Sequence, residues 1–198
     1  MKHLLYIFLL FQTQIYAQNS KAHFSHKIME VSGDLNKDQL PDKVAVTQDT
    51  IQENAPYQLQ IFLAQPNGTY QLFVTSTKLI EPKYPNGREG FSSGYTLADI
   101  SIKNNILAIS FDLIRGNFTY KFRLQNGNFD LIGYTEVQSN SLGRIYYTDF
   151  NLSTGIKIEK TENYATDEII SNTKRKVMIR PLPKIQDIIS FQNDDDIR

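Results

Sequence analysis

The chain has 198 residues, a length that suits one ordinary domain. Its 40% hydrophobic and 12% aromatic content can supply a core, and its 21 basic side chains balance 21 acidic ones, which argues against a nucleic-acid binder. Cysteine is absent, so disulfides, thiolate zinc sites and thiol catalysis are excluded.

The first 17 residues have the pattern of a secretory signal peptide. Lys2 gives a basic start, Leu4–Phe11 (LLYIFLLF) is an unbroken apolar run, and Ala17 is a small residue at the cleavage position. The alternative is a membrane anchor, but a helix of eight residues is only about 12 Å long, against a hydrocarbon core of roughly 30 Å. We therefore expect an exported protein, periplasmic or secreted, with no membrane span after removal of residues 1–17.

After a polar lead-in over residues 18–25, short runs of β-forming residues alternate with turn residues. Pro66-Asn67-Gly68 has the residue types of a tight hairpin turn, because Asn and Gly tolerate positive φ. Turn signals of this kind recur along the chain and predict an antiparallel meander of roughly nine to eleven strands. The strands are expected at Val44–Val46, Tyr57–Ala64, Tyr70–Thr75, Leu97–Ile102, Ile106–Ile114, Phe118–Leu124, Phe129–Val137, Arg144–Leu152, Ile156–Lys160 and Val177–Ile179.

These runs predict a single all-β domain over residues 18–198. The meander can bury its edges by closing as a sandwich, as a barrel or as propeller-blade-like sheets, and the sequence leaves these closures open. Residues 81–94 contain two prolines and three glycines, which predict a long loop between an N-terminal half (18–80) and a C-terminal β-meander half (95–180). The polar residues 163–173 predict a second loop before the last strand.

One segment has the spacing of a metal-binding loop. In Gly33–Val46 (GDLNKDQLPDKVAV), acidic and amide side chains recur at every second position. A loop that curls around a cation brings such positions to one side, and hard oxygen ligands favour Ca²⁺. The candidate ligands are the side chains of Asp34, Asn36, Asp38 and Asp42 and the main-chain carbonyl of Leu40. The alternative is a polar turn that holds no metal.

The same segment resembles the calcium-binding signature of FG-GAP/VCBS-type repeats, Gly-Asp-x-Asn-x-Asp-Gly-x-x-Asp followed by an apolar strand. The resemblance implies an FG-GAP-like N-terminal half and a structural Ca²⁺ site. Gln39 stands where that family has a glycine, and positive φ at this point costs Gln about 1 kcal/mol or more. The chain also resembles small exported proteins of Bacteroidetes in Phe129–Thr135 and Asp149–Gly155.

The predicted domain lacks the residues that most catalytic mechanisms need. Beyond the signal peptide the sequence has two histidines, His23 and His26, both at its start. Catalytic triads and histidine-ligated zinc are therefore not expected. A glycan hydrolase needs only two carboxylates and is the alternative function. Its candidate residues are Glu81, Glu89, Asp99, Asp112, Asp130, Glu136 and Asp149.

The long loop is the best candidate for partner binding. Tyr84, Arg88, Phe91 and Tyr95 combine aromatic area and a guanidinium group with flexible glycines. The alternative is a plain crossover between two sheets. We expect a non-enzymatic binding or accessory domain that uses this loop to meet a protein or glycan partner.

Overall fold

The computed structural model describes residues 23–91 and 94–189, so the predicted signal peptide lies outside the described residues. Within these ranges the chain forms eleven strands and no helix, which confirms the all-β antiparallel meander. The strands are β1 (Phe24–Gly33), β2 (Asp42–Asp49), β3 (Tyr57–Ala64), β4 (Tyr70–Ser76), β5 (Thr96–Lys103), β6 (Ile106–Leu113), β7 (Gly116–Gln125), β8 (Asn128–Ser139), β9 (Arg144–Asn151), β10 (Ile156–Asn163) and β11 (Ile169–Lys176).

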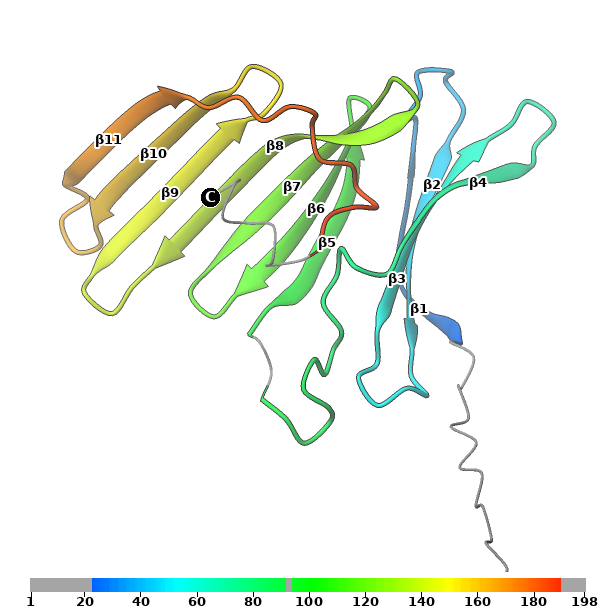
Figure 1. The fold of residues 1–198 in the computed structure, drawn as a ribbon, viewed down its shortest axis with the longest axis horizontal. Coiled ribbons are helices and arrows are strands. Elements are labelled where there is room, and N and C mark those ends of the chain that lie inside the picture. The colour runs from blue at the N-terminus through cyan, green and yellow to red at the C-terminus, as the bar shows by residue number, and fades with distance from the viewer. Residues whose placement is uncertain (1–22, 92–93, 190–198) are drawn as a thin grey trace, which may run out of the picture.

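The strands form two sheets, each a simple antiparallel meander (Figure 1). Strands β1 to β4 make a four-stranded sheet, and β5 to β11 make a seven-stranded one. Asn and Gly take positive φ at the tight turns, as at Asn126 (φ 49°) and Gly127 (φ 74°) between β7 and β8. The two sheets stay separate over the described residues and do not close into a barrel.

Two strands differ from the sequence predictions. Strand β1 begins within the predicted lead-in, residues 18–25, and continues through residues for which we predicted no element. Strand β11 includes Ile169–Thr173, which we expected to be loop, and the predicted strand Val177–Ile179 lies outside β11. Both strands pair along their whole length with a neighbour, β2 or β10. Hydrogen bonds to these neighbours therefore form β1 and β11, although neither sequence alternates clearly between apolar and polar residues.

The sheets share one hydrophobic core. Alternate residues of β2 and β3, such as Val46 and Ile61, are buried together with Phe111, Phe118 and Tyr120 of β6 and β7. The rings of Phe111 and Phe118 are stacked with centroids 4.8 Å apart. Phe73 of β4 meets Phe129 of β8 edge to face at 5.7 Å, which joins the two sheets directly.

Contacts at the sheet margins fix how the two sheets meet. β1 lies beside β5, where Gly33 packs closely against Ile102. The side-chain amide of Asn105 donates to the carbonyl of Asp34 at 2.9 Å. The segment 180–189 lies between the sheets in Figure 1, and the Ile185 N–H donates to the Phe129 carbonyl at 2.9 Å. The strands β9 to β11 extend beyond the four-stranded sheet (Figure 1).

No described residue belongs to a helix long and apolar enough to cross a membrane.

Candidate functional site

The predicted metal loop is a compact turn between β1 and β2. Its exposed oxygens accept hydrogen bonds from its own backbone: Asp34 from the N–H groups of Lys37 (2.6 Å) and Gln39 (3.1 Å), and Asp38 from that of Leu40 (2.8 Å). The Asn36 side chain donates to Asp38 at 2.8 Å. The turn is therefore held by side-chain-to-backbone hydrogen bonds, which short Asp and Asn side chains commonly form in turns.

Asp42 has a different position from the other predicted ligands. It is fully buried, and its two oxygens accept from the backbone N–H groups of Leu35 at 2.7 Å and Ala64 at 2.9 Å. These bonds tie the turn to the end of β3, 22 residues further along the chain. Asp42 is thus an internal brace of the four-stranded sheet in this structure.

Backbone strain is concentrated at the centre of the turn. Lys37 and Gln39 have φ values of 70° and 68°, a region that favours glycine. Gln39 is the position at which the FG-GAP/VCBS signature has its glycine. No three His, Cys, Asp or Glu side chains in the described part of the chain group together in a way that could hold a metal ion. The predicted Ca²⁺ site, including the carbonyl of Leu40, stays a prediction.

The long loop between β4 and β5 is docked on the loop between β2 and β3. The N–H groups of Lys83 and Tyr84 donate to the carbonyls of Ala55 (3.2 Å) and Asn54 (3.0 Å). The Arg88 guanidinium donates to the Thr50 carbonyl at 3.0 Å and lies 5.6 Å from the centre of the Tyr84 ring. The Tyr84 and Arg88 side chains are therefore held at fixed places on the surface.

Asp49, at the end of β2, holds the loop 50–56, on which the long loop is docked. Its buried carboxylate accepts from the N–H groups of His23, Ile51 and Gln52 at 2.7 to 3.1 Å. The hydrogen bond from the His23 backbone, with those from Ile51 and Gln52, holds the pKa of Asp49 below its usual range. Asp49 thereby positions the loop 50–56 on which the long loop rests.

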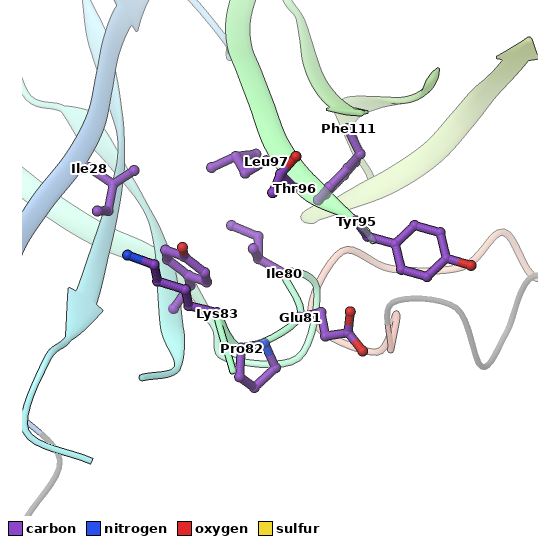
Figure 2. Close-up of a pocket in the computed structure, with 10 residues that line it drawn as sticks. Ile28, Ile80, Glu81, Pro82, Lys83, Tyr95, Thr96, Leu97 and Phe111 are labelled. Atoms are coloured by element: carbon purple, nitrogen blue, oxygen red, sulfur yellow. The ribbon is translucent and has the colours of Figure 1, made fainter. Parts of the chain in front are cut away.

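A cavity of about 140 Å³ lies between the two sheets behind the long loop. Figure 2 shows Ile28 on one side, Leu97 and Phe111 on the other, and Ile80 below them. Charged groups come from the loop itself, because Glu81 and Lys83 also line the cavity. One carboxylate oxygen of Glu81 is buried and has no hydrogen-bond partner among the described residues.

Tyr57 adds a further polar group to the wall of this cavity. Burial raises the pKa of the Tyr57 hydroxyl, and the nearby Lys83 ammonium offsets part of the rise. A small apolar cavity with a carboxylate, an ammonium and a neutral phenol at its margin can hold a compact ligand with one polar end.

The structure brings the four predicted partner-binding residues together only in part. Tyr84 and Arg88 are in contact, and Asn86 donates to the carbonyl of Phe91 at 3.1 Å. The Phe91 side chain is 92% exposed. Tyr95 lies across the loop, where it lines the cavity beside Thr96. Sequence reasoning missed Ile28, Tyr57 and Phe111, because their strand positions signal only packing.

The candidate carboxylates of a hydrolase do not share any of five hollows in the described part of the molecule, one of which is the cavity behind the long loop. Each of these hollows has at most one carboxylate in its wall. Glu81, Asp130 and Asp149 each line a different hollow. A two-carboxylate site requires both groups within one cleft, about 5–10 Å apart.

Comparison with models of protein families, with curated proteins and with solved structures gave no match.

Proposed function

We propose that the chain is an exported, non-enzymatic binding or accessory domain that meets a protein or glycan partner through the long loop. The observation that supports this most is the presentation of Phe91. Its ring is exposed on a loop whose backbone is hydrogen-bonded to the loop 50–56. An exposed aromatic side chain on an ordered loop gives a partner large contact area at low entropic cost.

Neighbouring groups extend this surface. Tyr84 and Arg88 supply an aromatic face and hydrogen-bond donors, and the apolar cavity lined by Tyr95 lies behind the same loop. Aromatic residues and arginine are the side chains most often dominant in binding surfaces. Because none of the five hollows has two carboxylates in its wall, binding is favoured over the alternative, a glycan hydrolase.

The test compares the mature protein with its Phe91→Ala variant on an array of oligosaccharides and in capture from an envelope extract of the source cells. We expect a retained glycan or protein whose binding falls about tenfold or more in the variant, as for a hot-spot residue. The Leu72→Ala variant is the control, since it truncates an exposed apolar side chain on β4, outside the long loop.

Three outcomes separate the alternatives. Equal retention by Phe91→Ala and wild type would contradict partner binding through this loop. Equal loss in Phe91→Ala and Leu72→Ala would show that the capture is non-specific. Release of reducing sugar from the oligosaccharides would establish the hydrolase instead.

A separate proposal concerns the turn between β1 and β2. We propose that it takes Ca²⁺ at millimolar concentration through Asp34, Asn36, Asp38 and the carbonyl of Leu40, with Asp42 as the brace behind it. The support is the presence of three oxygen-bearing side chains on one surface turn, together with the resemblance to FG-GAP/VCBS repeats. The ion would stabilise the entry to β2 and supply no catalytic step.

Thermal unfolding of the mature protein tests this proposal. We expect 5 mM Ca²⁺, which exceeds the dissociation constants of about 0.1–1 mM of extracellular sites, to raise the melting temperature, and Asp38→Ala to abolish the increase. Mg²⁺ at equal concentration is the control, because it prefers a smaller octahedral site. A melting temperature that is unchanged by Ca²⁺ would overturn the metal assignment.

A further inference from the structure

The meander places five of its turns at one end of the molecule. Successive antiparallel strands reverse direction, so every second turn lies at the same end. The turns between β2 and β3, β4 and β5, β6 and β7, β8 and β9, and β10 and β11 all lie along the lower margin of Figure 1. We call this margin the loop end, and the described residues of its turns are 50–56, 77–91 with 94–95, 114–115, 140–143 and 164–168.

Each turn of the loop end carries one large, exposed hydrophobic side chain. These five side chains, which we call the tips, are between 67% and 92% exposed. Single exposed apolar side chains are common on folded proteins and need no explanation. Here, however, one such side chain lies on each of five turns at the same end of the molecule, and this gathering indicates a surface that binds something. The tips are Ile51, Phe91, Ile114, Leu142 and Tyr164.

The opposite end has turns of a different character. Its turns, 34–41, 65–69, 104–105, 126–127 and 152–155, include no large exposed hydrophobic side chain. Of the remaining large exposed hydrophobic residues, Tyr146, Ile169 and Ile170 begin β9 and β11 and so adjoin the loop end. By the same measure Tyr70 and Leu72 begin β4 and Ile158 is near the start of β10, so these three adjoin the opposite end, and Met178 follows β11; all four are less exposed than the tips.

Direct contacts link neighbouring turns of the loop end. The N–H of Ser139 donates to the carbonyl of Arg115 at 2.9 Å, and that of Tyr164 donates to Gly143 at 2.8 Å. The Ile114 side chain lies against the backbone of Gly94. With Arg88 bonded to Thr50, these contacts connect all five turns in one row. Over the described residues, the tips therefore lie on turns that contact one another in sequence along this margin.

The chemistry of the row fits a lipid surface. Polar residues separate the tips, and the seven-stranded sheet alone is about 29 Å wide at roughly 4.8 Å per strand spacing. A rigid protein partner would need a matching pit for every tip, whereas lipid headgroups rearrange around isolated apolar and aromatic side chains. Both charge signs flank the tips, as in Arg88 and Arg115 against Glu53 and Glu168, which complements the phosphate and ammonium groups of zwitterionic lipids.

We propose that the loop end docks on the surface of a zwitterionic lipid bilayer, with the five tips inserted at the level of the headgroups. This role goes beyond the partner binding proposed above, with which it shares Phe91 and Arg88. The binding strength comes from apolar side chains on several turns, so added salt changes it little.

A sedimentation assay with the mature chain and phosphatidylcholine–phosphatidylethanolamine vesicles tests the proposal. The variant Ile114→Ser/Leu142→Ser/Tyr164→Ser lies outside the long loop, and its control, Tyr70→Ser/Leu72→Ser/Met178→Ser, removes exposed apolar side chains elsewhere. We expect the partition coefficient to fall about tenfold or more in the first variant and less than about twofold in the control. Absence of wild-type binding, or equal loss in both variants, would overturn the proposal.

A second measurement avoids loss-of-function variants. The chain has no tryptophan, so Leu142→Trp introduces a single fluorescent reporter at a tip and Leu72→Trp one away from the loop end. We expect vesicles to blue-shift the emission of Leu142→Trp alone, with little change between 0.1 and 0.5 M NaCl, the range over which the screening length falls about twofold. A blue shift that appears with protein concentration and without lipid would show instead that a second copy covers the tips.

The two proposals fail separately. The variant Ile114→Ser/Leu142→Ser/Tyr164→Ser keeps Tyr84, Arg88 and Phe91. We therefore expect it to lose vesicle binding and to capture a protein or glycan at the wild-type level. A wild type that captures a partner but ignores vesicles would retain the proposed function and contradict lipid docking.

Discussion

Replacement of Phe118 by alanine lowers the free energy of unfolding by about 3–5 kcal/mol, the range for loss of a buried phenylalanine ring. Phe118 is buried in β7, stacked on Phe111 and in edge contact with Tyr120 at 5.2 Å between centroids. The variant loses these contacts and leaves a cavity that close-packed neighbours fill only in part. Urea unfolding followed by circular dichroism measures the change.

Phe91→Ala is the matched control for Phe118→Ala. It removes the same ring from an exposed turn and is expected to change the free energy of unfolding by about 0.5 kcal/mol or less. If Phe118→Ala cost less than about 1 kcal/mol, the aromatic residues would not form the main core. Unfolding in two separate transitions would show that the two sheets do not share it.

Asp42→Ala is expected to cost about 3 kcal/mol or more, because it removes two charge-assisted hydrogen bonds at once. The backbone N–H groups of Leu35 and Ala64 both donate to this buried carboxylate. Without it they remain buried and unpaired, which adds the full desolvation penalty. Urea unfolding in the presence of a chelator measures this loss without any contribution from Ca²⁺.

Asp38→Ala is the control for the buried brace. Asp38 is exposed and bonds only within its own turn, so its loss is expected to cost about 1 kcal/mol or less. Asp42→Asn, which keeps one acceptor oxygen, is expected to fall between the two variants. An equal cost for Asp42→Ala and Asp38→Ala would contradict the assignment of Asp42 as an internal brace.

The alternating apolar runs predicted most of the strands, because each places one face in the core. Tyr57–Ala64, for example, was expected as a strand from its alternation and is β3. β11 carries no such pattern, since all eight of its residues are exposed and its formation depends on pairing with β10. The sequence of β1 is similarly mixed, and its pairing with β2 contains two register shifts.

The candidate sites were predictable only where they are local. The Asp and Asn spacing indicated the turn at residues 34–42, but the bond from Ala64 that makes Asp42 a brace depends on the pairing of β2 with β3. Of the tips, Phe91 was predicted as a binding residue, and the other four were missed for the same reason. Ile114 was expected to end a strand, and its role as one of five aligned tips follows from the arrangement of both sheets.

The central claim is that both sheets fold as one unit around a shared core, since this unit fixes the loop end and its turns. Native-state hydrogen exchange tests it most directly. We expect the slowest amides of β2 and β3 to exchange with the same opening free energy as those of β6, β7 and β8, with β11 exchanging earlier. Exchange of the four-stranded sheet through a separate opening of lower free energy would contradict the account.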